Sequence, residues 1–230
     1  DATVDFTNVL PTIEVTKTPS VSEVPETGGN VTFTFVVKNT SSEEPVTITS
    51  LSDSVYGTLA GDADCMVGTV LAAGASAKFS ITEWVEGDYS GPDHVNVFTA
   101  KAVDNDSTEA TDTDDATVDF TNVLPTIEVT KTANPTAVLE GVGGLVTFTF
   151  TVKNTSSEEP VTITSLVDSV YGPLDGDDDC KVGTILAAGA SASFEITRWV
   201  NGDYSGPDHV NVFTAHAEDN DGTDATDSDD

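Results

Sequence analysis

The stretch Val31-Thr32-Phe33-Thr34-Phe35-Val36-Val37 decides the fold of this 230-residue chain. Apolar side chains stand at every second position and threonines at most of the positions between them, which is the period of a β-strand with one buried face. Nearly the same stretch returns at residues 146–152. The alternation predicts that four aromatic side chains lie in the core: Phe33, Phe35, Phe148 and Phe150.

Six further segments of the first half alternate in the same way, between turns rich in Gly, Pro, Asn, Asp and Ser. They span residues 12–18, 45–51, 67–71, 76–84, 94–103 and 116–124. No segment has the period of an amphipathic helix. Seven strands in about 115 residues predict an all-β, immunoglobulin-like sandwich. In the strand at 94–103, an outward Lys101 turns Phe98 inward and leaves Asn96 in need of a buried partner.

The two halves of the chain are near-copies of each other. Residues 1–18 recur unchanged as 115–132, residues 38–51 as 153–166, and residues 87–100 as 202–215. Such self-similarity is typical of a tandem array. We therefore expect one module over residues 12–125 and a second over 126–230 that lacks its own last strand, with residues 1–11 equivalent to the last strand of a preceding module or subunit.

The charge balance excludes some functions. Forty acidic residues against eight Lys and Arg give a net charge of −32. Nucleic acids and anionic membranes both favour clustered Lys and Arg, so neither is an expected partner. No run of about 18 apolar residues is present, so the sequence predicts no membrane-spanning helix.

Two acidic stretches, residues 104–115 and 219–230, follow strand patterns directly. Their carboxylates are one or two residues apart and repel each other unless a cation lies among them. Ca²⁺ prefers flexible cages of Asp, Asn and carbonyl oxygens. We therefore predict several Ca²⁺ ions per chain; the alternative is a solvated acidic loop. The predicted ligands are Asp104, Asp106, Asp112, Asp114, Asp219, Asp221, Asp227 and Asp229.

Further acidic residues lie near these stretches or at the opposite end of each module. In a sandwich, the loop between the second and third strands shares an end with the acidic stretch, which adds Glu43, Glu44, Glu158 and Glu159. At the opposite end lie Glu86, Asp88, Asp93, Asp203 and Asp208. Where two acidic ends meet in an array, bridging cations would stiffen the joint.

A family resemblance covers nearly the whole of both halves. The motifs that carry it are Lys-Thr, Val-Thr-Phe-Thr-Phe, Lys-Asn-Thr, Leu-Ala-Ala-Gly-Ala-Ser-Ala, Asp-Asn-Asp and Asp-Asp-Ala-Thr-Val, in that order. This order resembles the conserved-repeat domain of bacterial and archaeal surface proteins, the domain of unknown function eleven. The resemblance implies an immunoglobulin-like extracellular module, commonly found in arrays in adhesins, sheaths and stalks. It implies no particular ligand.

The cysteines depart from that family pattern. Many members have two cysteines around the Leu-Ala-Ala-Gly segment, whereas here only the first remains, as Cys65 and Cys180. Equivalent positions of successive modules lie too far apart for a disulfide within the chain. The open alternatives are buried thiols and a cross-link to a neighbouring chain.

The sequence offers little for catalysis. The three histidines are His94, His209 and His216. A Ser-His-Asp grouping can be drawn from Ser90, Asp93 and His94, but an oxyanion-hole glycine motif is absent. We therefore expect no enzyme.

These features together predict a structural repeat unit of an extracellular filament, stalk or adhesin shaft, stiffened by Ca²⁺ and assembled head to tail. The expected partner is the protein itself, with Ala2 to Val9 either donated as a strand to another copy or continuing a covalent array. The rival hypothesis is a surface adhesion module that binds a glycan, a cell surface or ice. Its candidate contacts are the aromatic residues Tyr56, Trp84, Tyr171 and Trp199.

Overall fold

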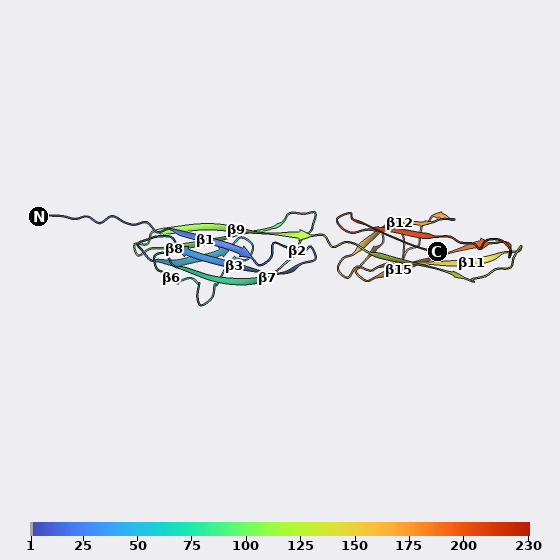
Figure 1. Cartoon of the computed structure of the whole chain (residues 1–230), viewed down its shortest axis with the longest axis horizontal. Helices are drawn as coiled ribbons and strands as arrows, with labels where there is room; N and C mark the ends of the chain where they lie inside the picture. Colours follow the sequence, from blue (N-terminus) through green and yellow to red (C-terminus); the bar gives the residue numbers. More distant parts are fainter. Residues whose placement is uncertain (1) are drawn as a thin grey trace. The chain divides into compact units, whose positions relative to one another are not determined.

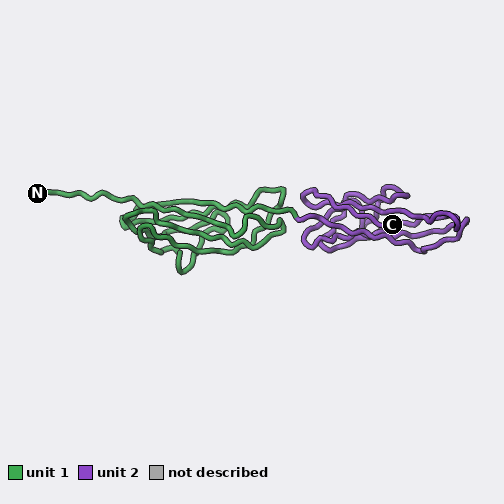
Figure 2. Tube along the Cα trace, viewed as in Figure 1, with its two compact units in different colours: residues 1–122 green, residues 123–230 purple. Residues whose placement is uncertain are grey.

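The computed structural model describes residues 2–230 and divides into two compact units, one up to Asn122 and one from Val123 to Asp230 (Figure 2). Every regular element of the described residues is a β-strand, so the all-β prediction is confirmed. Within these residues no helix is long and apolar enough to cross a membrane.

The described residues of unit 1 form nine strands, two of them only two residues long. Figure 1 shows their course along the chain. The strands are β1 (Ile13–Pro19), β2 (Glu23–Pro25), β3 (Gly29–Asn39), β4 (Val46–Asp53), β5 (Gly57–Thr58), β6 (Val70–Leu71), β7 (Ser76–Val85), β8 (His94–Val103) and β9 (Glu109–Thr121).

Two sheets enclose the core of unit 1. One has the order β1-β3-β7, and the other has the order β2-β9-β8-β4-β5, with β6 beside β4. The pairing is antiparallel except between β2 and β9, which run parallel. Phe33, Phe35 and Phe98 are fully buried between the sheets, and Phe35 stacks on Phe79 with a centroid separation of 4.8 Å. The alternation in β3 therefore has the predicted buried face.

Unit 2 repeats this order. Its strands are β10 (Ile127–Asn134), β11 (Gly144–Asn154), β12 (Val161–Asp168), β13 (Gly172–Pro173), β14 (Ile185–Leu186), β15 (Ser191–Val200), β16 (Phe213–Glu218) and β17 (Asp224–Asp229). One sheet is β10-β11-β15, and the other is β13-β12-β16-β17 with β14 beside β12. Phe148 and Phe150 are buried, as predicted.

The last strand of unit 1 differs from its prediction. The sequence predicts it at 116–124, whereas β9 begins at Glu109 and ends at Thr121. Asp112 and Asp114 therefore lie inside a strand and not in the loop after β8. They lie on the same face of the strand as the buried Ala116, Val118 and Phe120. The period of two therefore predicts their place in β9 better than their charge does.

Unit 2 holds only the first half of the corresponding strand. The sequence analysis assigned no last strand to this module, but β17 pairs with β16 from Glu218↔Asp224 to Phe213↔Asp229. In unit 1 the four residues His94 to Val97 pair with Val118 to Asp115. Their equivalents, residues 209–212, belong to no strand, and β2 has no counterpart among the described residues of unit 2. One side of this sheet is therefore unpaired.

Candidate functional site

A buried polar cluster joins the two sheets of unit 1. Lys17 of β1 extends across the core, and its Nζ donates a hydrogen bond of 2.5 Å to Oδ2 of Asp53, the last residue of β4. Nζ also donates to the backbone carbonyl of Asn96 in β8, at 3.0 Å. The Asn96 side-chain amide lies 3.4 Å from both Asp53 oxygens. Neither charged side chain reaches solvent.

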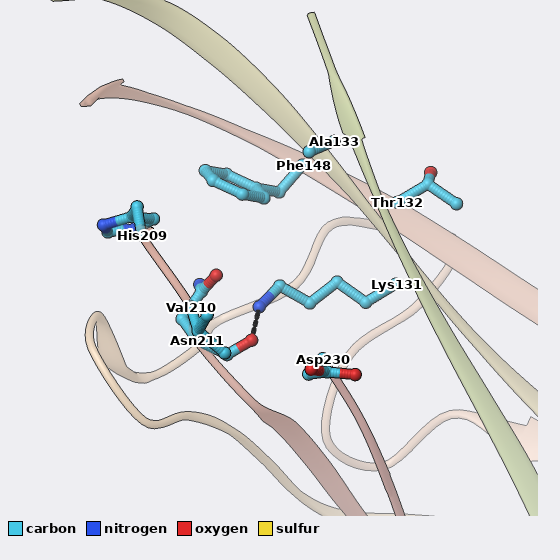
Figure 3. Close-up of a pocket in the computed structure, with 8 residues that line it drawn as sticks. All are labelled: Lys131, Thr132, Ala133, Phe148, His209, Val210, Asn211 and Asp230. Carbon is cyan, nitrogen blue, oxygen red and sulfur yellow. Dashed lines mark hydrogen bonds between the residues drawn. The ribbon is translucent and has the colours of Figure 1, made fainter. Parts of the chain in front are cut away.

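Unit 2 builds the same cluster from Lys131, Asp168 and Asn211. Figure 3 shows Lys131 and Asn211 of this cluster. Lys131 Nζ lies 3.3 Å from Asp168 Oδ2 and donates to the Asn211 carbonyl. The Asn211 amide donates to the same Asp168 oxygen at 2.6 Å. A cavity of about 210 Å³ borders this cluster, lined also by Phe148 and His209.

Burial sets the protonation of both clusters. Desolvation lowers the pKa of Lys17 and of Lys131, although their carboxylate partners oppose this. Burial would by itself raise the pKa of Asp53, but hydrogen bonds from Lys17 and from the Val55 and Tyr56 backbone outweigh it and hold that pKa below its usual value. The aromatic rings of Phe33 and Phe35 lie 4.9 and 5.5 Å from Lys17 Nζ and keep water away.

Sequence analysis missed this cluster except for the need of Asn96 for a buried partner. A usable signal was present, because Lys17 stands in the same phase of its strand as Ile13 and Val15. The structure confirms that phase, since Val15 is 4% exposed. A lysine in the apolar phase of a strand requires a buried counter-charge.

The acidic loop after β8 is organised around Asp104. Its Oδ1 accepts hydrogen bonds from the backbone N–H groups of Asp106 and Thr108, at 2.9 and 2.7 Å. Its Oδ2 is buried and has no hydrogen-bond partner among the described residues. The register Thr47↔Val103 brings Glu44, just before β4, to the same end of the sheet, and Glu44 Oε2 is likewise buried without a partner.

The equivalent loop in unit 2 has the same geometry. Asp219 Oδ1 accepts from the backbone of Asp221 and Thr223, and its buried Oδ2 lacks a hydrogen-bond partner in the described part of the chain. Gly222 has a φ of +77°, where the first loop places Ser107 at +66°. Buried carboxylate oxygens of this kind fit a cation ligand, because a desolvated anion requires compensation.

Four predicted ligands make other contacts. Asp112 Oδ2 accepts the Val15 backbone N–H at 2.8 Å, and Asp114 Oδ2 accepts that of Lys17 at 2.7 Å. Asp227 and Asp229 accept from Val129 and Lys131 in the same manner, at 2.8 Å each. These carboxylates satisfy the free edge of the first strand of each unit. They do not share the loop of Asp104 or Asp219.

The remaining predicted ligands are scattered. Asp88 and Asp203 each accept hydrogen bonds from the serine two residues later, and Glu86 accepts from the Trp84 indole. Glu159 is buried and Asp221 is partly buried. The exposed members are Glu43, Glu86, Asp88, Asp93, Asp106, Glu158, Asp203 and Asp208.

The aromatic residues of the adhesion hypothesis divide into two kinds. Trp84 and Trp199 are 56% and 59% exposed. Tyr56 and Tyr171 are partly buried, and each hydroxyl lies 3.2 Å from a histidine Nε2, that of His94 or His209. Cys65 and Cys180 are buried free thiols.

An open groove of about 930 Å³ runs along the unpaired side of unit 2. Its apolar lining includes Val138, Val146, Phe148 and Val200. In unit 1 the corresponding place is filled, since Val118 is fully buried and Phe120 is 8% exposed. Tyr204, at the groove, is 91% exposed against 53% for its equivalent Tyr89.

Comparisons with known proteins add no identification. No family model matches the chain, and no curated protein does. The resemblance to the conserved-repeat domain therefore stays a prediction.

Some solved structures are loosely similar. Red sea bream transglutaminase is 8% identical, with 94% of this chain and 30% of that chain covered and a TM-score of 0.34. The YadV chaperone is 10% identical, with 94% and 98% covered and a TM-score of 0.27. The exo-chitosanase CsxA of Amycolatopsis orientalis is 18% identical, with 85% and 25% covered and a TM-score of 0.27. The chain thus spans less than a third of the transglutaminase and of the chitosanase, and similarity at these TM-scores carries no argument about function.

Proposed function

We propose that this chain is a structural, non-enzymatic repeat unit of an extracellular filament, stalk or adhesin shaft, and that it assembles head to tail by strand donation. In this assembly the segment Ala2 to Val9 of one copy completes unit 2 of another. Ca²⁺ bound at the acidic loops would stiffen the units. The observation that carries the proposal is the correspondence between the open groove of unit 2 and the filled one of unit 1.

The donated segment has the required sequence. Ala2 to Val9 is identical to residues 116–123, of which Ala116 to Thr121 complete β9 in unit 1. Val4 and Phe6, the equivalents of the buried Val118 and Phe120, are 79% and 97% exposed. The exposed apolar segment is identical in sequence to the strand that fills the corresponding place in unit 1. Together with the unpaired apolar groove of unit 2, this identity supports strand addition.

The backbone also favours this occupant. In unit 1 residues 115–118 pair with β8, and residues 119–121 pair with β2. Unit 2 leaves the equivalents of both partner segments outside any strand. A donated strand would pair with residues 209–211 on one side, following the register of unit 1, and with the segment around Val138 on the other, which satisfies the backbone groups of both.

The experiment measures assembly of the purified chain by light scattering and electron microscopy. We expect head-to-tail polymers that Phe6→Ala abolishes. Asp5→Ala is the matched control, because its equivalent Asp119 is exposed, and it should assemble normally. Gly202→Ala should also block assembly, because a Cβ there would occupy the place of the donated phenylalanine ring.

A synthetic peptide of residues 2–9 distinguishes strand donation between copies from a donor strand supplied by a covalently following repeat. It should bind to a chain in which Phe6→Ala prevents self-assembly, and a scrambled peptide should not bind. A chain that stays monomeric but binds the peptide would assign the donor strand to a covalently following repeat. Absence of both polymers and peptide binding would refute strand donation.

A further inference from the structure

The buried clusters of Lys17, Asp53 and Asn96 and of Lys131, Asp168 and Asn211 hold the parts needed for an acyl transfer. A primary amine is the nucleophile, a carboxamide carbon is the acyl group, and a carboxylate touches both. In unit 1 the Lys17 ammonium and the Asn96 amide lie 2.5 and 3.4 Å from the same Asp53 oxygen, Oδ2. In unit 2 the corresponding distances to Asp168 Oδ2 are 3.3 and 2.6 Å.

We infer that Lys17 and Asn96 form an intramolecular isopeptide bond between Nζ and Cγ, with Asp53 as the proton carrier. Lys131 and Asn211 form the equivalent bond in unit 2 with the help of Asp168. Each bond links the two sheets of one unit covalently. Since Lys17 and Asn96 are 79 positions apart, the bond in unit 1 closes most of that unit into a ring.

The reaction balances without an added reagent. The Lys17 ammonium passes a proton to the Asp53 carboxylate, and the neutral amine attacks the Asn96 Cγ. Asp53 then donates that proton to Nδ2, which lies 3.4 Å from its Oδ2, and the bond from Cγ to Nδ2 breaks as ammonia leaves. The Asp53 carboxylate takes the second proton from the former lysine nitrogen. The products are a secondary amide, ammonia and a protonated Asp53.

The surroundings favour each step. Burial lowers the pKa of Lys17, which makes the neutral amine accessible. Phe33 and Phe35 lie close to Nζ and exclude water, so that hydrolysis does not compete. The fold holds the amine and the amide side by side, so the reaction is intramolecular and the entropic cost of bringing two molecules together is avoided. The Asn96 amide nitrogen faces both Asp53 oxygens, so Asp53 can protonate the leaving group, while Asn96 Oδ1 is buried and has no hydrogen-bond partner in the described residues.

Figure 3 shows the same approach in unit 2. Lys131 reaches from its strand toward Asn211 across the core, and its Nζ ends at the Asn211 backbone. The Phe148 ring centroid lies 5.5 Å from this Nζ, in the position that Phe33 occupies in unit 1. Because each unit brings a lysine, an aspartate and an asparagine into contact, two bonds per chain are expected.

The experiment is an intact mass measurement of the denatured chain. Each bond removes one ammonia, about 17 Da, so the wild-type chain should be about 34 Da lighter than its sequence. After proteolysis, fragmentation should identify one peptide pair joined through Lys17 and Asn96 and another joined through Lys131 and Asn211. A wild-type mass equal to that of the sequence would overturn the inference, and this result depends on no variant.

Variants then test the assignment. Asn96→Ala and Lys17→Arg should each reduce the mass deficit, relative to the variant's own sequence, from about 34 to about 17 Da. Asp53→Ala should do the same, because it removes the proton carrier. Lys38→Arg, at an exposed lysine, is the matched control and should keep both bonds. A loss of about 18 Da per bond would be water, which means that Asp53 is the acyl group, and it would overturn the role given to Asn96.

Discussion

Gly87 lies directly against the ring of Phe120, and a Cβ on this glycine would come within 2.3 Å of the ring. Gly202, its counterpart in unit 2, has open space at the same point, with no atom beyond its chain neighbours within 4 Å. The two glycines have the same local sequence. The difference in space beside them therefore reflects the strand segment that carries Phe120, which is present in unit 1 and has no counterpart in the described residues of unit 2. The space beside Gly87 and Gly202 is therefore a direct measure of how the two units differ.

We expect Gly87→Ala to destabilise unit 1 by about 1–3 kcal/mol, because the buried ring must move to make room. Gly202→Ala should leave the stability of the unassembled chain within about 0.5 kcal/mol. Denaturant unfolding of both variants checks this. Equal losses would mean that the place beside Gly202 is also filled in solution.

The carboxylate of Asp114 holds the edge of the first strand. Asp114→Ala removes the acceptor of the Lys17 backbone N–H, and we expect it to lower the free energy of unfolding by about 1.5–3 kcal/mol. Asp119→Ala, at an exposed position of the same strand, should change it by less than about 0.5 kcal/mol. Hydrogen exchange at the Lys17 amide should be faster in Asp114→Ala alone. Indistinguishable variants would argue against this edge contact.

Phe35 and Thr34 occupy opposite faces of β3. Phe35→Ala should cost about 3–5 kcal/mol, because it empties a fully buried site beside Phe79 and Phe98. Thr34→Ala removes only a hydroxyl contact with Ser80 on the other face and should cost less than about 1 kcal/mol. Similar losses at both positions, measured by chemical denaturation, would contradict the observed strand register.

Ca²⁺ should raise the thermal stability of the chain if the unpartnered oxygens of Asp104 and Asp219 are ligands. Free Ca²⁺ at 100 times its dissociation constant stabilises by about 2.7 kcal/mol per site. Thermal unfolding in Ca²⁺ and in a chelator tests this, with Asp104→Ala expected to remove the gain of unit 1. Superimposable curves would leave the loops as solvated acidic turns, and an equal response to Mg²⁺ would indicate charge screening.

Cys65 should resist alkylation in the folded chain. Its thiol is fully buried, and burial together with nearby Asp62 raises its pKa to about 11. At pH 8 both access and the thiolate fraction are therefore low. Iodoacetamide should label Cys65 and Cys180 only after denaturation, as mass spectrometry can show. Rapid labelling under native conditions would contradict the burial of these side chains.

Period-two alternation was sufficient for the core of each sandwich. It placed Phe33, Phe35, Phe148 and Phe150 correctly, and the strand at His94 to Val103 has the predicted bounds. These residues could be predicted because burial of a strand face depends on a pattern that is local in sequence.

The acidic residues show why the remaining structure was harder to predict. The acidic stretch that follows the strand pattern at 94–103 predicts a loop at Asp112 and Asp114, yet each carboxylate accepts an N–H from a strand 97 positions away. The partners of Lys17 and the half-length β17 likewise depend on contacts between distant segments. Sequence alone identified Asp104 as a candidate ligand but could not show which of its oxygens lacks a partner.

The parallel course of β1 and β9 has a mechanical consequence. The bonded pairs Val15 with Asp112 and Lys17 with Asp114 advance in the same direction along both strands, and β2 also runs parallel to β9. Tension applied to unit 1 through Ile13 and Thr121 therefore shears these contacts, and they must rupture together instead of unzipping one by one. Unit 2 has the equivalent hydrogen bonds between β17 and β10 but, among its described residues, no counterpart of β2, so it should rupture at a lower force until a further strand fills its groove.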